Sequence, residues 1–236
     1  MADIKVIALD IDGTLTDHSR KICLNAIEAI RNVEKIGIPV VIVTGNIFYF
    51  SYAAATLIGA TGGIVAENGG VISKLDENGF NSIEVLSNRE NIDYAYEYLV
   101  DNFSDKYDIR KVDDSPARLS EIAMYRTFDG DTLKNLLKDF DVEVYDTHFA
   151  LHITDSKVNK GTGLKSVVEN LGFKLNNVLA VGDSENDIEF LNAVGIKVAV
   201  NNADDKLKKI ADYVTVLSYG DGVAEAIDKF VFNDYN

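Results

Sequence analysis

The chain has 236 residues, of which 47% are hydrophobic and 26% are charged, and its formal net charge is −15 at pH 7. This length allows one large domain or two smaller ones, and the composition is typical of a soluble globular protein. The strong negative charge argues against nucleic acid or an anionic membrane as a partner, because both bind basic surfaces.

Cysteine content and hydropathy exclude further classes of protein. Cys23 is the only cysteine, so there is no internal disulfide and no cysteine-rich metal site. No apolar run is long enough to cross a bilayer, and the first residues lack the basic end and apolar run of a signal peptide. We therefore expect a soluble cytoplasmic protein. The sequence gives no indication of its oligomeric state.

An apolar run over residues 5–9 ends in Asp10, followed closely by Asp12 and Gly13. A run that is apolar on both faces is typical of a central strand in a parallel sheet. Side chains two residues apart share a face of a strand, so Asp10 and Asp12 are expected to point together into the crevice where open α/β sheets bind ligands. Two carboxylates this close require a proton or a cation, and Mg²⁺, which prefers oxygen ligands, fits best. The alternative is that Asp10 caps the next helix and Asp12 is a turn residue.

The next elements again place a polar residue after an apolar strand. The patterns predict a helix over residues 24–36, a strand over 38–43 that ends in Thr44 and Gly45, a helix over 50–58, and a hairpin of strands 64–67 and 71–73. The hairpin turn contains Asn68, which stands at the end of its first strand.

After a turn cluster at residues 76–79 the strands alternate apolar and polar residues. Helices are predicted over 92–103 and 133–140, and strands over 107–112, 119–126, 142–147 and 149–154. This order predicts an antiparallel sheet with helices on one face, a separate α+β unit. The opposite face carries Tyr125, Tyr145 and His152. That face is either solvated or, if the unit folds over the crevice, it recognises the substrate; a register error of one residue would swap the two faces.

The solid apolar pattern returns after Asp155. Lys160 opens a helix, and a buried strand over 178–181 ends in Gly182 and Asp183, with Asn186 and Asp187 close behind. Two further strands, over 196–200 and 213–216, and a last helix over 222–230 complete the set. The α/β domain is thus discontinuous, because the α+β unit interrupts it at an exposed loop. The predicted domains are a core of residues 1–80 and 156–236 and an inserted unit of residues 81–155.

Parallel strands would bring the polar strand ends to one edge of the sheet. Each polar residue alone could be a helix cap or match a helix dipole. Together, carboxylates with a nearby lysine and hydroxyl suit a cation and a phosphoryl group.

These motifs resemble those of haloacid dehalogenase-superfamily phosphatases. Residues 10–14 match Asp-x-Asp-Gly-Thr, Thr44 ends the strand of the second motif, Lys160 matches the lysine of the third, and residues 182–187 match Gly-Asp-x-x-x-Asp. Lys157 is an alternative lysine, but glycine follows Lys160 at a helix start, as in the motif. The insertion lies where the family carries its type C2 cap. Its short length and order of elements resemble the archaeal-type phosphoglycolate phosphatases of the Cof-like branch.

The resemblance implies an α/β fold, with a Rossmann-like parallel-sheet core and an inserted α+β cap, and hydrolysis through an aspartyl-phosphate. Asp10 would be the nucleophile, and Asp12 would be the general acid and then the general base. Mg²⁺ would be bound by Asp10, the backbone carbonyl of Asp12, Asp183 and, directly or through water, Asp187. The substrate phosphate would be bound by Thr44, Gly45, Lys160 and Asn186.

The resemblance also implies a small phosphorylated metabolite as substrate, with 2-phosphoglycolate the first expectation. Its carboxylate would need a donor from the cap, and His152, Tyr145, Arg118 and Arg126 are all open. The alternatives are a phosphatase for a sugar phosphate or pyridoxal phosphate, a phosphomutase or phosphotransferase, and a non-catalytic binding protein. The presence of all four motifs argues against the last.

Overall fold

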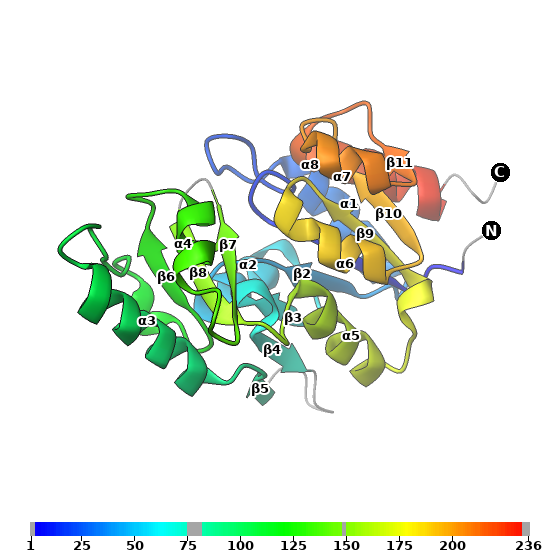
Figure 1. Ribbon diagram of the computed structural model, residues 1–236. Helices are drawn as coiled ribbons and strands as arrows, with labels where there is room; N and C mark the ends of the chain where they lie inside the picture. The colour runs from blue at the N-terminus through cyan, green and yellow to red at the C-terminus, as the bar shows by residue number, and fades with distance from the viewer. Residues whose placement is uncertain (1–2, 75–81, 148–149, 233–236) are drawn as a thin grey trace.

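A computed structural model describes residues 3–74, 82–147 and 150–232 of the chain. Two units are visible in Figure 1, a large sheet flanked by helices and a smaller sheet with its own helices. The smaller unit is inserted between Val85 and Lys160. The turn cluster predicted at residues 76–79 lies outside the described residues.

The large sheet has, over the described residues, eight strands in the order β11-β10-β9-β1-β2-β3-β4-β5. They are β1 (Val6–Leu9), β2 (Val40–Val43), β3 (Ile64–Ala66), β4 (Val71–Lys74), β5 (Ser82–Val85), β9 (Val178–Gly182), β10 (Ile196–Ala199) and β11 (Tyr213–Val214). β1 lies between parallel β2 and β9, while β4 and β5 are antiparallel. Every residue of β1 is buried, which explains why the sequence is apolar on both faces of this strand.

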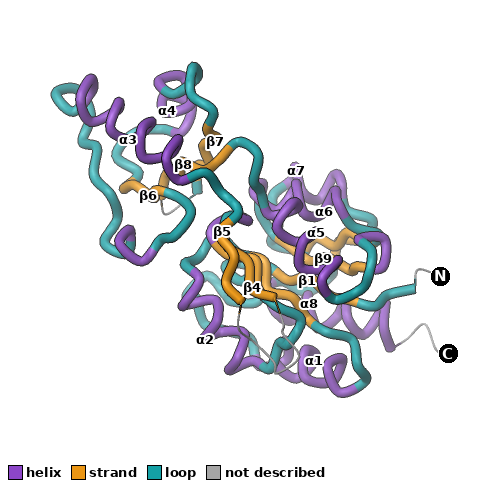
Figure 2. Tube along the Cα trace, turned by 90° about the horizontal axis from the view of Figure 1, so that it is seen from below, coloured by secondary structure: helices purple, strands orange, loops and turns teal. Residues whose placement is uncertain are grey.

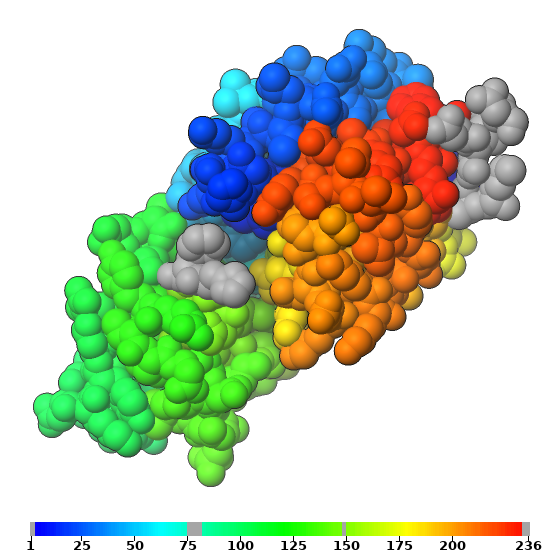
Figure 3. All heavy atoms as spheres, turned by 90° about the horizontal axis from the view of Figure 1, so that it is seen from above, coloured from blue at the N-terminus to red at the C-terminus, as the bar shows by residue number. Residues whose placement is uncertain are grey.

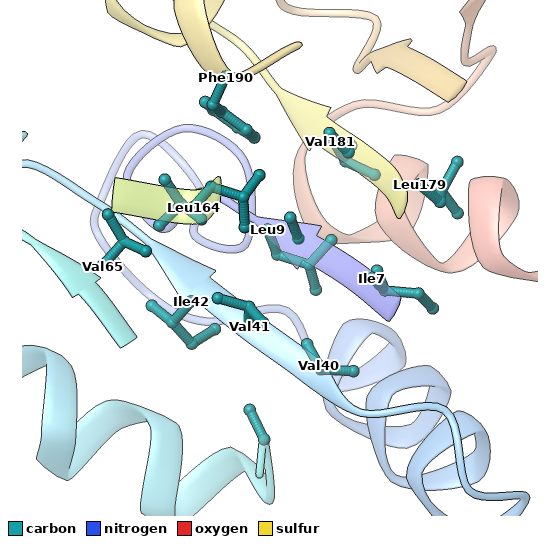
Figure 4. Packing of buried hydrophobic residues seen from close by; sticks show 14 of the residues in the cluster. Ile7, Leu9, Val40, Val41, Ile42, Val65, Leu164, Leu179, Val181 and Phe190 are labelled. Carbon is teal, nitrogen blue, oxygen red and sulfur yellow. The ribbon is translucent and has the colours of Figure 1, made fainter. Parts of the chain in front are cut away.

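Helices cover both faces of the large sheet (Figure 2). On one face lie α1 (Leu24–Lys35), α2 (Phe48–Ile58) and α8 (Tyr219–Ile227), and on the other α5 (Lys160–Asn170), α6 (Ile188–Ala193) and α7 (Asp205–Ile210). Short 3-10 turns are η1 (Glu67–Gly69), η3 (Leu175–Asn177) and η4 (Glu185–Asp187), and a π turn, η5 (Asp228–Phe232), follows α8. Figure 4 shows Leu9 of β1 between neighbouring strands, with Leu164 of α5 packed on the sheet. No helix in the described ranges is both long and apolar enough to cross a membrane.

The smaller unit contains an antiparallel sheet in the order β6-β8-β7 within its described residues. These strands are β6 (Ile122–Tyr125), β7 (Val142–Asp146) and β8 (Ala150–Asp155), and the helices are α3 (Arg89–Phe103) and α4 (Gly130–Leu136). Figure 2 shows both helices on the side of this sheet that faces away from the large sheet. The alternation predicts that the helices meet Ile122, Met124, Val142, Val144, Phe149, Leu151 and Ile153. All of these except Phe149 pack in a separate hydrophobic cluster, with Val142 partly buried at its edge, and Phe149 lies outside the described residues.

The strand predicted over residues 107–112 is wrong. The segment forms one isolated bridge, between Lys111 and Met124, with two flanking backbone hydrogen bonds to β6. The pairing stops because the chain turns at Asp114 into a 3-10 turn, η2 (Ser115–Ala117), which contains a proline.

β5 is an element that the patterns did not predict. It pairs antiparallel with β4, from Val71 opposite Val85 to Lys74 opposite Ser82, although it follows the expected boundary at residue 80. All four of its residues are exposed, so no buried face produces a recognisable pattern. The division of the chain at residues 80 and 155 stays a prediction.

The carboxylates of Asp155 and Glu67 accept hydrogen bonds that hold the smaller unit against the large one. Asp155 accepts a hydrogen bond from the backbone N–H of Asn88 at 2.6 Å and another from Lys157 at 2.9 Å, so it joins the two connecting segments. Glu67 in η1 accepts from the backbone N–H groups of Leu119 at 2.9 Å and Ser120 at 2.8 Å, and from the Ser120 hydroxyl at 2.8 Å. Figure 3 shows the resulting contact, with the smaller unit in green against the blue and orange core.

A close approach of two backbones fixes the start of α5, and it can be tested at Gly69. Gly69 has a φ of +99°, and a Cβ there would lie 2.0 Å from the carbonyl oxygen of Asn159. We expect Gly69→Ala to lower the free energy of unfolding by about 2 kcal/mol or more, because left-handed strain and a backbone clash add. Urea unfolding measures this loss.

Gly37→Ala is the matched control for this substitution. Gly37 has a similar φ of +85°, but a Cβ there would have no atom within 4 Å. Its loss should be about 1 kcal/mol, from backbone strain alone. Equal losses in the two variants would contradict the role of the close approach.

Candidate active site

The polar strand ends do meet at the carboxyl edge of the large sheet, beneath the smaller unit. A cavity of about 610 Å³ lies there, between the two units. Its walls include Asp10, Asp12, Thr44 and Asp183 from the core and Arg118 and His152 from the smaller unit. The face of the smaller sheet that could have been solvated is therefore turned toward the core.

Lys160 is the cation at the centre of this edge. It is the first residue of α5, which begins at a capping box formed by Asn159 and Thr162, and its side chain is 1% exposed. Its Nζ donates to Asp10 Oδ1 at 2.9 Å and to Asp187 Oδ1 at 2.6 Å. Burial lowers the pKa of Lys160, but the two carboxylates outweigh burial and raise this pKa above its ordinary value, so the ammonium stays charged.

Asp10 and Asp183 form a crowded carboxylate pair beside Lys160. Burial raises the pKa of Asp10 well above its ordinary value, Lys160 lowers it, and Asp187 and Asp183 raise it again. Burial, followed by the charge of Asp187, raises the pKa of Asp183 to about 7, although the Thr14 hydroxyl donates to Asp183 Oδ1 at 2.9 Å. The positive charge of Lys160 therefore compensates only part of the negative charge that Asp10, Asp183 and Asp187 bring together.

A divalent cation fits this cluster. Asp10, Asp183 and Asp187 each offer one oxygen, and these atoms lie within 4.8 Å of one another. A cation would relieve the repulsion that raises the pKa values of Asp10 and Asp183. Ligands that are oxygen atoms only suit Mg²⁺, Mn²⁺ or Ca²⁺ rather than a softer metal.

Asp187 also has a structural role, because it holds Lys160 and the loop after β9 in place. It is fully buried, and its Oδ2 accepts from the backbone N–H of Asp183 at 2.9 Å and of Ser184 at 3.1 Å. Since its Oδ1 accepts from Lys160, Asp187 holds both the lysine and the loop after β9. Asn186 lies on this loop, lines the cavity and accepts a short hydrogen bond from the Ser184 hydroxyl.

Asp12 and Thr44 are positioned by two residues to which the sequence reasoning gave no role. Asp12 Oδ1 accepts from Arg20 Nε at 3.0 Å, and Asp12 Oδ2 accepts from Asn46 Nδ2 at 2.5 Å. The Thr44 hydroxyl oxygen accepts from the backbone N–H of Asn46 at 3.1 Å and from its side chain at 3.0 Å. The hydroxyl hydrogen of Thr44 therefore remains for an acceptor in the cavity, since none of the described residues takes it.

Arg20 and Gly45 have unusual local surroundings. Arg20 has a φ of +61°, in the left-handed region of backbone conformations. It lies in a loop whose sequence has no apolar periodicity, so its importance shows only in the structure. Gly45 lines the cavity, and a Cβ there would lie 2.8 Å from Asn68 Oδ1. The motif indicated Gly45; nothing in the sequence marked Arg20.

The structure separates the three residues predicted to recognise substrate from the smaller unit. His152 lines the cavity, with Nδ1 2.8 Å from Glu121 Oε1. Tyr145 instead donates its hydroxyl to Glu189 Oε2 at 2.9 Å, and burial raises its pKa. Tyr125 is hydrogen-bonded to Asp113, and the Arg110 guanidinium lies 5.4 Å from its ring centre. Neither tyrosine is among the described residues that line the cavity.

Comparisons with known proteins agree with the motifs. The sequence profile of a family described as haloacid dehalogenase-like hydrolase matches residues 7–115 and 102–227. A protein of Methanothermobacter thermautotrophicus named phosphoglycolate phosphatase is 49% identical over 228 residues, covering 97% of this chain and 99% of that protein. One of the same name from Methanobrevibacter smithii is 48% identical, with coverages of 97% and 99%. A crystal structure from Thermoplasma acidophilum matches with a TM-score of 0.84 at 26% identity, covering 96% and 98% of the two chains.

The raised pKa of Asp183 makes stability depend on pH when divalent cations are chelated. Folded Asp183 keeps its proton up to about pH 7, whereas in the unfolded chain it loses the proton near about pH 4. The stabilisation is therefore complete below about pH 4 and is lost as the pH rises through about 7. In EDTA we expect the free energy of unfolding to fall over this range by about 2–4 kcal/mol, with Asp10 contributing in the same direction.

The same experiment with Mg²⁺ tests the cation site. Mg²⁺ should restore stability at pH 8 and have little effect at pH 5, because a proton competes for the same oxygens. Asp183→Asn should reduce the pH dependence and abolish the Mg²⁺ effect in urea unfolding. A Mg²⁺ effect that persists in Asp183→Asn would contradict this assignment.

Proposed function

This chain belongs to the haloacid dehalogenase-like hydrolases, and we propose that it is a phosphoglycolate phosphatase, a phosphoric monoester hydrolase that converts 2-phosphoglycolate to glycolate and phosphate in the cytoplasm. The observation that carries the reaction is the buried Asp10 carboxylate, 2.9 Å from Lys160 Nζ and in the same cavity as Asp12. The choice of substrate rests on relatives of that name at 49% and 48% identity along nearly the whole chain.

Asp10 acts as the nucleophile. Lys160 holds Asp10 Oδ1, so the other oxygen can attack phosphorus. The bond between phosphorus and the glycolate oxygen breaks, and Asp12 gives its proton to that leaving oxygen. Asp12, now a carboxylate, takes a proton from the water that hydrolyses the aspartyl-phosphate. Arg20 and Asn46 hold the Asp12 side chain in place for both transfers.

The substrate phosphate is bound by groups that surround Asp10. The Thr44 hydroxyl donates its free hydrogen, Lys160 supplies a buried positive charge, and the loops that carry Gly45 and Asn186 close the sides. Charge-assisted hydrogen bonds of this kind stabilise the transferring group most when they are fixed in advance. The buried contacts of Lys160 and Thr44 provide that rigidity.

Mg²⁺ is the proposed resident cation. Asp10 and Asp183 would hold it, together with the Asp12 backbone carbonyl and, directly or through water, Asp187. When bound, it supplies positive charge that offsets the carboxylates and polarises the transferring phosphoryl group. A chain with a net charge of −15 needs such local positive charge to bind a dianion.

Phosphate release from a panel of phosphorylated metabolites tests the function. The wild-type protein should release phosphate from 2-phosphoglycolate faster than from hexose phosphates or pyridoxal phosphate, and EDTA should abolish the release. Asp10→Asn should lower kcat at least about 10³-fold with every compound, because the nucleophile is lost. Phosphate release that survives in Asp10→Asn would contradict the assignment of Asp10 as the nucleophile. A preference for a hexose phosphate would show that 2-phosphoglycolate is not the substrate.

Asp12→Asn separates the acid role from the base role. With 2-phosphoglycolate, kcat should fall about 10²- to 10⁴-fold, because the alkoxide leaving group needs a proton. With p-nitrophenyl phosphate the leaving group needs none, so a burst of one nitrophenolate per enzyme should precede slow turnover. Stopped-flow absorbance measures the burst. Equal slowing of both substrates without a burst would contradict the two roles.

A further inference from the structure

A cationic side chain of the smaller unit lies beside the phosphate-binding edge. Arg118 lines the cavity with 7% of its side chain exposed, and its Nη1 donates to the carbonyl oxygen of Gly45 at 3.2 Å. We propose that Arg118 binds the carboxylate of the substrate, and that Asp114 occupies the same edge of the guanidinium until the substrate replaces it. This inference rests on the function proposed above.

The size of the substrate requires a carboxylate site close to the phosphate site. In 2-phosphoglycolate, one oxygen and one methylene separate phosphorus from the carboxylate carbon. Arg118 meets this requirement, because its guanidinium is hydrogen-bonded to the backbone of Gly45. Gly45 follows Thr44, whose hydroxyl is proposed to bind the phosphate.

Two of the other open donors of the smaller unit, Arg126 and Tyr145, fit this requirement less well. Arg126 also lines the cavity, but it binds both oxygens of Asp146 on β7 at 2.6 and 3.1 Å, has 46% of its side chain exposed and has no hydrogen bond to the core among the described residues. The hydroxyl of Tyr145 is directed to Glu189. Arg118 is therefore the guanidinium that lies close enough to the phosphate site to bind the carboxylate of this short substrate.

The two edges of the Arg118 guanidinium have different surroundings. Nη1 is held by Gly45 and by a short hydrogen bond to Glu121, whose side chain is fully buried. Nε and Nη2 instead donate to the two oxygens of Asp114, at 3.3 and 3.0 Å. Asp114 lines the cavity and is 43% exposed. The Nη1 side is thus anchored, and the Nε and Nη2 edge is the one that can change partner.

Asp114 presents to Arg118 what the substrate would present, a carboxylate with two oxygens on the fork of a guanidinium. A partly exposed ion pair of this kind is weak, so it can be displaced. Exchange of one carboxylate for another also leaves one carboxylate bound to this edge of Arg118 before and after the substrate binds. Asp114 is therefore a placeholder for the carboxylate of the substrate.

Glu121 is the positioning residue of this site. Its Oε1 accepts from Arg118 and lies 2.8 Å from His152 Nδ1, and its Oε2 accepts from Asn68 Nδ2 of the core at 2.8 Å. Burial raises the pKa of Glu121, but His152 and Arg118 outweigh burial and lower this pKa below its ordinary value, so Glu121 is ionised. Glu121 therefore holds Arg118 and His152 next to Asn68, a core residue that lies beside Gly45.

Two variants and two substrates test the proposal. Ethyl phosphate serves as the probe without a carboxylate. Arg118→Lys keeps the charge but loses the fork, and it should raise KM for 2-phosphoglycolate at least about tenfold while changing KM for ethyl phosphate less than about twofold. Asp114→Asn should lower KM for 2-phosphoglycolate about two- to fivefold and leave ethyl phosphate unchanged. Arg110→Lys is the matched control and should alter neither, because Arg110 binds both oxygens of Asp108 and is not among the described residues that line the cavity.

The outcomes distinguish this inference from the proposed function. If the wild-type protein shows no preference for 2-phosphoglycolate over ethyl phosphate, the proposed function itself fails. If the wild type has the preference and Arg118→Lys keeps it, Arg118 is not the carboxylate site. An increased KM for 2-phosphoglycolate in Asp114→Asn overturns the placeholder. Ethyl phosphate turnover shows that each variant is folded, and Asp114, being partly exposed, remains informative if Arg118→Lys is unstable.

Discussion

A buried ammonium group holds the catalytic edge of this protein together. Lys160 joins Asp10 at the end of β1 to Asp187 after β9, and it opens a helix whose cap touches Gly69 of the hairpin turn. An unpaired lysine at this depth would lose its proton, and unpaired carboxylates would gain one. The requirement for mutual neutralisation therefore fixes three segments that are far apart in the sequence. These contacts of Lys160 thereby set the positions of Asp10 and Asp187 in the proposed phosphoryl-transfer site.

Chemistry and recognition are divided between the two units. The core supplies the carboxylates, the lysine and the hydroxyl that suit phosphoryl transfer, all at strand or helix ends that packing makes rigid. The smaller unit supplies side chains from a loop and a sheet face, and these side chains are held by a buried network around Glu121. A cap of this kind can change its substrate by changing a few residues, while the reaction in the core stays the same.

The sequence predicted the parts of the fold that burial dictates. The apolar runs located β1, β2 and β9, and the motifs predicted a lysine near the carboxylates at the strand ends; the structure shows Lys160, 150 positions after Asp10, hydrogen-bonded to it. Period-two alternation placed His152 and Tyr145 on one face. His152 lies on the central strand β8 and lines the cavity, whereas Tyr145 lies opposite it on the edge strand β7 and reaches Glu189. Arg20 and Asp114 lie in loops, where no periodicity marks a role, and exposed β5 has no buried face to reveal it.

The parallel pairing of β1 with β9 has a consequence for synthesis on the ribosome. β1 emerges first, but its partner begins only at Val178, after the whole inserted unit has been translated. The segment from α3 to β8 is contiguous and has its own hydrophobic cluster, so its contacts can form while the chain is still growing. The nascent core meanwhile exposes an unpaired apolar edge along β1. Closure of the large sheet is therefore the late step of folding, and the interval before it is when a chaperone would be most useful.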